Sequence, residues 1–173
     1  MKRTLLTMFA LFAVLTATTL HSTVLAGSTK TISAPVTVNP TAAINEELAL
    51  ARSATAKYHS VEAAEADGYI SINFCEPGEG CHWLNLSFID GTFDPARPEI
   101  LLYAPDENGR LRLVAVEYVE PIALLPGGPP QGFTGVEDEW REDTEGAGLW
   151  ELTVWLWLHN PNGMFEQHNP RVP

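Results

Sequence analysis

The sequence is short of positive charge and of recognisable catalytic motifs. Its 173 residues include 10 Lys and Arg against 22 Asp and Glu, which gives a formal net charge of −12. Such an acidic chain should repel nucleic acids and anionic membrane surfaces, so we expect neither as a partner. It has no G-x-S-x-G or Ser-x-x-Lys nucleophile signature, no P-loop or dinucleotide fingerprint and no EF-hand spacing. The sequence therefore has no local motif for a serine nucleophile, a nucleotide-binding loop or an EF-hand calcium site.

Long hydrophobic runs are also missing, except at the N-terminus. Residues 5–15 are apolar apart from Thr7, they follow two basic residues, and Ala26 ends a Val-Leu-Ala motif. The run is shorter than the roughly 20 residues of a membrane span, and the pattern is that of a secretory signal peptide. We therefore expect cleavage after Ala26 and an exported mature chain, periplasmic or secreted, without membrane attachment. Residues 27–38, rich in Ser, Thr and Val, predict a flexible arm.

Only two cysteines are present, Cys75 and Cys81, and both lie in the mature part. An even count in an exported chain indicates a disulfide. The bridge would close a short loop that contains Pro77 and Gly78, a pair that favours a turn. A loop of this size contributes about 2–3 kcal/mol in the chain-entropy description, so the bridge would hold a local corner of the fold. A thiolate metal site is the alternative use of the pair.

Helical signals come first in the mature chain. Asn39 and Pro40 suit the N-cap and first position of a helix, and apolar residues then recur at helical spacing. Ser60 can cap a second short helix, which Gly68 ends because glycine adopts the left-handed conformation without strain. The apolar stripe of the first helix consists of Ile44, Leu48, Ala51 and Tyr58.

Strand signals follow the helices. The residues between 99–103 and 111–119 include Pro, Asp, Asn and Gly, which predicts a hairpin there. Residues 121–145 are rich in Pro and Gly and then acidic, and we expect a long loop that is either functional or simply solvated. Helices followed by strands predict an α+β fold for a single domain at 39–173: N-terminal helices packed on an antiparallel sheet of about five strands. The predicted strands are 69–75, 82–88, 99–103, 111–119 and 149–158.

The last predicted strand, 149–158, has two unlike faces. Its even positions are all apolar and would face the helices across the core. Its odd positions mix Glu151 and Thr153 with the indoles of Trp155 and Trp157, and they suit the wall of a cavity that stacks a sugar ring or holds an apolar ligand. The alternative is a second small core beneath the acidic loop.

Glu117 and His82 are the strongest candidates for chemistry. Glu117 is a carboxylate inside an apolar strand, where it needs a partner such as His82, Glu151 or Arg97, or a bound ion. His82 lies on the apolar face of its strand, and the two residues could hold a transition metal ion, copper or zinc, through one nitrogen and one oxygen. The alternatives are a structural salt bridge and a hydrogen-bonded core histidine, because no H-x-x-x-H or H-E-x-x-H spacing is present.

Several longer motifs occur together. Residues 80–83 (GCHW), 94–99 (DPARPE), 111–118 (LRLVAVEY), 154–157 (VWLW) and 159–165 (HNPNGMF) are the most specific. With these motifs the chain resembles a family of small exported bacterial proteins of unassigned function, over most of residues 50–173. The resemblance supports an exported bacterial protein and implies no reaction.

The chain departs from this family at two places. In the resembling proteins the last strand often carries histidines where this chain has Leu149 and Thr153. With His82 they would form a metal-type site, so the resemblance implies that two ligands are replaced here. It also implies a C-terminal cysteine as the usual partner of the first cysteine, for which Cys81 would be a local replacement.

Three functions are compatible with these patterns. We favour an exported module that binds a small ligand or a metal ion, with Glu117, Glu151, Thr153, Trp155 and Trp157 against the ligand. An enzyme that uses Glu117 and His82 as acid and base is the second hypothesis. The third is a structural or interaction protein in which both indoles are packed away.

Overall fold

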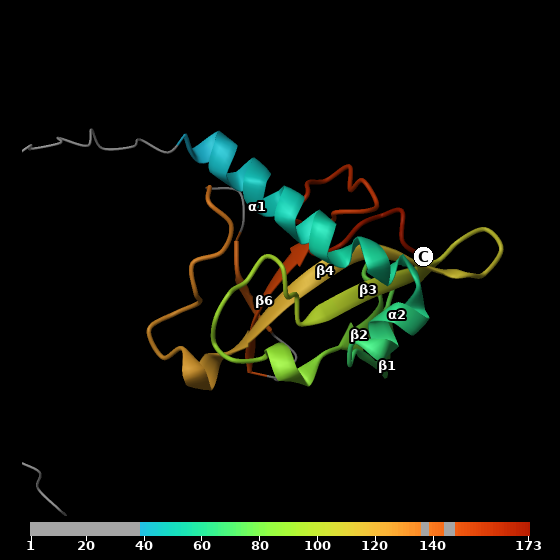
Figure 1. The fold of residues 1–173 in the computed structure, drawn as a ribbon, viewed down its shortest axis with the longest axis horizontal. Coiled ribbons are helices and arrows are strands. Elements are labelled where there is room, and N and C mark those ends of the chain that lie inside the picture. Colours follow the sequence, from blue (N-terminus) through green and yellow to red (C-terminus); the bar gives the residue numbers. More distant parts are fainter. Residues whose placement is uncertain (1–38, 136–138, 144–147) are drawn as a thin grey trace, which may run out of the picture. The chain divides into compact units, whose positions relative to one another are not determined.

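The described part of the chain is an α+β fold. The computed structural model describes residues 39–135, 139–143 and 148–173. They form two helices and a six-stranded antiparallel sheet (Figure 1). The predicted signal peptide, the predicted arm and part of the predicted acidic loop lie outside these residues. No helix in the described ranges is both long enough and apolar enough to cross a bilayer.

Both helices begin at the residues that the sequence indicates, and the second ends before the predicted glycine. Helix α1 (Pro40–Thr55) is capped by the side chain of Asn39, which accepts a hydrogen bond from the amide of Thr41. A 3₁₀ turn (Ala56–His59) leads to α2 (Val61–Ala66), whose N-cap Ser60 accepts from the amide of Ala63. Gly68 follows with a φ of 94°, as a glycine after a helix C-terminus should.

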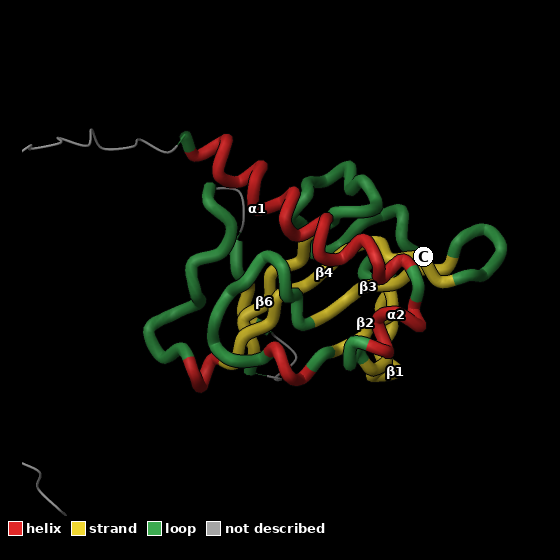
Figure 2. The backbone as a smooth tube through the Cα atoms, viewed as in Figure 1, coloured by secondary structure: helices red, strands yellow, loops and turns green. Residues whose placement is uncertain are grey.

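The six strands lie in the order β1-β2-β3-β4-β6-β5. Figure 2 shows β3 and β4 at the centre of the sheet, joined by the predicted hairpin. The sequence pattern did not predict β5, a two-residue strand in the acidic stretch that pairs with β6. The bounds are β1 Ile70–Glu76, β2 Gly80–Leu84, β3 Ile100–Pro105, β4 Leu111–Pro121, β5 Arg141–Glu142 and β6 Leu149–Val154.

Two strands are shorter than their alternation predicted. The side chain of Asn85 accepts from the amide of Ser87 and turns the chain into a 3₁₀ segment, so β2 ends at Leu84 and does not continue to 88. Strand β6 ends at Val154 and does not continue to 158, because the amide of Trp155 leaves the ladder and donates to the carbonyl oxygen of Met164. In both segments the alternation of apolar residues continues beyond the last residue that pairs in the sheet.

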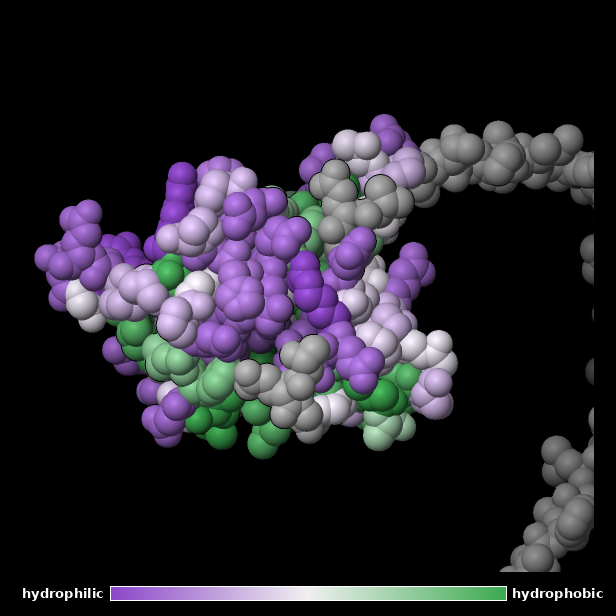
Figure 3. Space-filling model, turned by 180° about the vertical axis from the view of Figure 1, so that it is seen from behind, coloured by the Kyte–Doolittle hydropathy of each residue, from purple (hydrophilic) through white to green (hydrophobic). Residues whose placement is uncertain are grey.

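The two faces of the sheet are covered by different segments. Helix α1 contributes Leu48 and Ala51 to a core on one face, as the helical stripe predicted. On the other face a smaller core contains Ile100 and Leu102, and it is covered by Trp155 and by Val172 near the C-terminus. Figure 3 shows the molecule from behind, where hydrophilic side chains occupy the middle and apolar ones the lower border.

Strand β1 forms one edge of the sheet and buries little. Its alternating residues Ile70, Ile72 and Phe74 are 54%, 41% and 42% exposed. The pairing with β2 is interrupted between Ser71 and Cys75, and Asn73 in this bulge has a φ of 55°. The strand therefore presents an apolar row to solvent beside the second face of the sheet.

Candidate functional site

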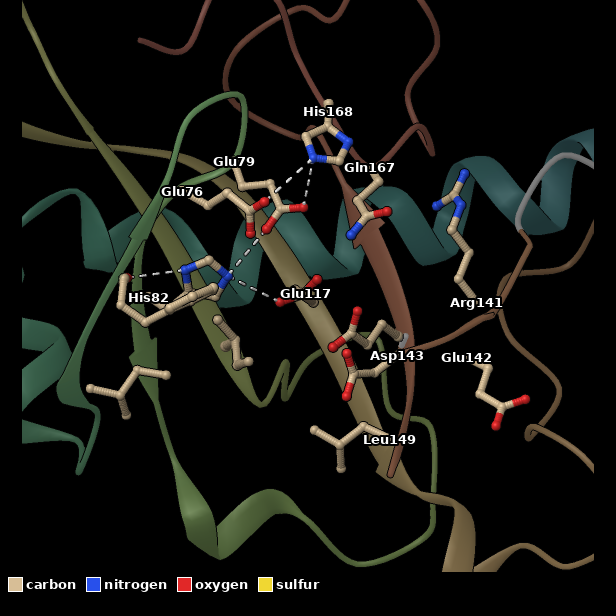
Figure 4. A pocket seen from close by; sticks show the side chains of 14 residues that line it. Glu76, Glu79, His82, Glu117, Arg141, Glu142, Asp143, Leu149, Gln167 and His168 are labelled. Carbon is tan, nitrogen blue, oxygen red and sulfur yellow. Dashed lines mark hydrogen bonds and ion pairs between the residues drawn. The ribbon is translucent and has the colours of Figure 1, made fainter. Parts of the chain in front are cut away.

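A cavity of about 630 Å³ lies on the second face of the sheet. Figure 4 shows α1 behind the sheet and the cavity residues in front of it. Its walls come from β1, the β1–β2 turn, β4, the β5–β6 region and the C-terminal segment. It is lined by Ile72, Phe74, Glu76, Glu79, His82, Ile100, Glu117, Arg141, Glu142, Asp143, Leu149, Glu151, Gln167 and His168.

The disulfide hairpin places one side of the cavity. Cys75 and Cys81 are bonded, as predicted, and they are paired directly opposite one another in β1 and β2. Gly80 is required beside the bridge: its φ is 100°, and a Cβ there would lie 2.6 Å from the main-chain oxygen of Tyr103. The turn between the cysteines carries Glu79, and β2 then presents His82 to the same cavity.

His82 lies beside two carboxyl groups. Its Nδ1 is 3.3 Å from the carbonyl oxygen of Phe74, and its Nε2 is 3.6 Å from Oε2 of Glu79 and 3.7 Å from Oε2 of Glu117 (Figure 4). A carbonyl oxygen only accepts, so Nδ1 donates a proton to it, and Nε2 needs a second proton to face carboxylates favourably. Burial alone would lower the pKa of His82, but the hydrogen bond with Glu79 and the charge of Glu117 raise it overall.

Glu117 projects from the middle of β4. It is only 3% exposed, and its Oε1 accepts a hydrogen bond of 3.0 Å from the hydroxyl of Thr153 on β6. Burial raises the pKa of Glu117 to about 7, against the opposing effect of His82. This carboxyl group therefore changes charge near neutral pH.

Glu151 lines the same cavity from β6. Burial, together with the neighbouring charges of Glu117 and Asp143, raises its pKa to about 8. Two carboxyl groups that repel one another cannot both ionise easily. The cavity therefore holds protons that a bound cation would displace.

The structure separates the predicted site residues into two groups. Glu117, Glu151 and His82 line the cavity, and Thr153 supports Glu117 from beneath. Arg97, a predicted partner of Glu117, instead bonds to Asp94 at 2.8 Å. Of the five predicted ligand contacts, Glu117 and Glu151 therefore line the cavity, and Thr153 supports Glu117 through a hydrogen bond.

The two indoles lie elsewhere, because β6 ends before them. Trp155 is buried in the smaller core and its Nε1 donates to the main-chain oxygen of Glu166. Trp157 packs against the core beneath α1, its Nε1 donates to Thr55 at 3.3 Å, and its ring meets that of His59 edge-on. Neither lines the cavity, which corrects the placement that the alternation predicted.

Sequence reasoning missed the residues that come from the turn and the tail. The amide of Asn169 donates to the carbonyl oxygen of Gly78 at 2.8 Å, which brings the C-terminal segment against the disulfide turn. As a result Nε2 of His168, whose side chain is exposed, lies 3.4 Å from Oε1 of Glu79. The position of Glu79 between Cys75 and Cys81, three residues before His82, was the one sequence signal that could have indicated its place in the site.

Metal ligation has limited support from the side chains. Among the described residues no group of three or more His, Cys, Asp or Glu is arranged as a metal site. Leu149 lines the cavity and Thr153 contacts Glu117, so both positions adjoin this site. The chain has a leucine and a threonine there, neither of which supplies a strong metal ligand.

Comparisons of the chain with protein-family models, with curated proteins and with solved structures gave no match. The functional argument therefore rests on the cavity itself.

Proposed function

We propose that this chain is an exported domain that binds a small ligand in the cavity between the disulfide hairpin, β4 and β6. The observation that carries the proposal is the convergence of Glu79, His82, Glu117 and Glu151 on one cavity of about 630 Å³. Ligand cavities in proteins commonly have volumes of about 300–1,000 Å³ and a few polar groups that fix the ligand.

A purely structural role explains this cluster less well. Buried ionisable groups are expensive, and well-packed apolar side chains of the same volume are often neutral or stabilising replacements. Here Glu79 and Glu117 are 4% and 3% exposed, and they line a space that the neighbouring side chains do not fill. Perturbed carboxyl groups in a cavity are more typical of a site than of a core.

Export rests on two observations. The N-terminal segment has the pattern of a signal peptide with cleavage after Ala26. The disulfide between Cys75 and Cys81 is compatible with an oxidising compartment, where such bonds form and persist.

The proposal is tested by NMR on the ¹⁵N-labelled purified protein. The probes are zinc chloride, copper(II) chloride, n-butylamine, butyrate and glucose, each titrated to millimolar concentration. We expect at least one probe to shift the amide signals of Glu79, Glu117 and Glu151 with saturation, and Glu117→Gln to weaken that effect. The matched control is Glu107→Gln, on the exposed β3–β4 turn. No saturable shift at the cavity with any of the five would overturn the proposal.

An acid–base enzyme is the second candidate, favoured by one observation. Nε2 of His82 and Oε2 of Glu117 face one another at 3.7 Å in an accessible cavity. General acid–base catalysis works best with groups that titrate near the operating pH, and the pKa of Glu117 is raised to about 7. Hydrolysis of 4-nitrophenyl esters and glycosides tests this. A bell-shaped pH profile that both Glu117→Gln and His82→Gln abolish would support it, and equal rates in these variants and the wild type would exclude it for these substrates.

A further inference from the structure

Acidic side chains outnumber basic ones on the described cavity lining, where the basic side chains are Arg141, His82 and His168. Its lining includes six acidic residues: Glu76, Glu79, Glu117, Glu142, Asp143 and Glu151. Arg141 is the only arginine or lysine on the described lining, and its guanidinium is directed to the C-terminal segment, to the main-chain oxygen of Phe165 at 3.1 Å and to Glu166 at 3.6 Å. The cavity is therefore complementary to a cation and opposed to an anion.

One wall of the cavity is apolar and accessible. Ile72 and Phe74 of β1 line it and stay 41% and 42% exposed. The ring of Phe74 lies 4.9 Å from the ring of His82, so the apolar wall directly adjoins the buried acidic cluster. A metal ion would make no use of this wall, whereas an organic cation with an apolar part would bury it.

The acidic groups also suit an ammonium better than a metal ion. They approach from separate elements, with Glu79 on the β1–β2 turn, Glu117 on β4 and Glu151 on β6. An ammonium has three N–H donors, which can each donate to an oxygen on a different element. A metal ion requires ligands within a narrow range of distances. No three of the described acidic, histidine or cysteine side chains meet that requirement.

We propose that the ligand is an organic amine with an apolar body, whose ammonium group binds among Glu79, Glu117 and Glu151 while its apolar part packs on Ile72 and Phe74. This inference rests on the ligand-binding function proposed above and names the chemical class of that ligand. The ammonium favours the ionised forms of Glu117 and Glu151, and it competes with the proton on Nε2 of His82, which faces Glu79 and Glu117 at 3.6 and 3.7 Å, so binding should release protons at neutral pH.

The test is isothermal titration calorimetry of the purified protein with a matched set of probes. 2-Phenylethylamine carries both features, 2-phenylethanol lacks the charge, methylamine lacks the apolar body, and 3-phenylpropionate reverses the charge. We expect 2-phenylethylamine to bind at least about ten-fold more tightly than 2-phenylethanol and methylamine, and 3-phenylpropionate not to bind. The heat should vary with the ionisation enthalpy of the buffer, which reports proton release.

Two pairs of variants locate the two halves of the ligand. Glu117→Gln should weaken 2-phenylethylamine by about ten-fold or more, while Glu107→Gln on the exposed β3–β4 turn should not. Phe74→Ala should also weaken it, while Ile70→Ala should not, because Ile70 is exposed on the same strand without lining the cavity. Circular dichroism of each variant shows whether it is folded.

The outcomes separate this inference from the proposed function. If 2-phenylethanol binds as tightly as 2-phenylethylamine, or if only zinc or copper binds at the cavity, the amine class is wrong and ligand binding stands. If 2-phenylethylamine and methylamine bind equally, the apolar wall is not used and the inference is overturned. If neither these probes nor the five NMR probes bind at the cavity, both proposals fail.

Discussion

On the face of the sheet that α1 covers, the fully buried polar groups include tyrosine hydroxyls, whereas the opposite face buries carboxyl groups and an imidazole. Each hydroxyl donates to one main-chain carbonyl oxygen, and burial raises the pKa of all three phenols, so they stay neutral. The donors and acceptors are Tyr69 to Pro98, Tyr103 to Tyr58 and Tyr118 to Pro95. These three hydroxyls therefore each have one partner and do not change charge with pH.

On the cavity face, buried ionisable groups lie beside an unfilled space. His82 lies beside the carboxyl groups of Glu79 and Glu117, and Glu151, whose pKa is raised to about 8, lines the same cavity. Buried neutral groups that each have one hydrogen-bond partner stabilise a core. Carboxyl groups with raised pKa values in a cavity can still bind a ligand. The comparison predicts that substitutions on the α1 face change mainly stability, and those on the cavity face change mainly its pH dependence.

The largest effect is expected on the α1 face. Tyr103→Ala removes a side chain that is completely buried, and should lower the free energy of unfolding by about 3–5 kcal/mol. Tyr103→Phe removes only the hydroxyl and leaves the carbonyl oxygen of Tyr58 without its donor, at about 1–2 kcal/mol. Urea unfolding measures both. A loss below about 1 kcal/mol for the alanine variant would contradict a well-packed core on this face.

The disulfide comes next. Replacing Cys75 and Cys81 together by Ser should cost about 2–3 kcal/mol, because the unfolded chain gains freedom in the short loop. The turn that carries Glu79 would also lose its covalent closure, so the cavity should be affected more than the α1 face. Hydrogen exchange tests this, with faster exchange expected at residues 76–82 than in α1. Uniform acceleration across both regions would show that the bridge supports the whole fold.

Glu117→Gln should change stability by about 1–3 kcal/mol, and in a pH-dependent direction. The folded-state pKa of Glu117 is raised to about 7 from an ordinary 4.5. Between these values the unfolded chain releases a proton that the folded chain keeps, so the stability of the wild type should fall as the pH rises from 4.5 to 7.

The glutamine variant should lack this part of the decline and be the more stable protein at pH 8. Urea unfolding across this pH range measures it, with Tyr103→Phe as the control that retains the wild-type slope. Parallel curves for Glu117→Gln and the wild type would show that Glu117 titrates normally.

The smallest effect is expected at the support of this carboxyl group. Thr153→Val preserves the shape and removes the 3.0 Å hydrogen bond to Glu117, at about 1 kcal/mol. That bond favours the ionised carboxylate, so its loss should move the pKa of Glu117 further above its ordinary value. A ¹³C NMR titration of the side-chain carboxyl measures the shift, and an unchanged midpoint would contradict the role of Thr153.

Local signals predicted the fold well. Asn39, Ser60 and Gly68 act on their own neighbours, so the sequence alone places the helix ends. Strand β5 consists only of Arg141 and Glu142, which is too short to show an alternation, so its pairing with β6 left no pattern in the sequence. The strand count rose from about five to six for this reason.

The sequence predicted those residues of the candidate site that are ionisable and lie within apolar strands. Glu117 and His82 are ionisable groups in apolar strands, and they do meet, although β3 lies between their strands. The indoles were placed wrongly because alternation outlasts the ladder at Val154. The contribution of His168 depends on the docking of the C-terminal segment, which is a long-range event that local pattern does not report.

The C-terminal docking has a consequence for how the protein is made. Asn169 and Val172 are buried, and Val172 completes the core on the cavity face. Until residues 169–172 have docked, the apolar surface around Ile100 and Leu102 lacks part of its cover. A chain that has not completed this step exposes an aggregation-prone surface, and a chaperone that holds it until the segment docks would raise its yield.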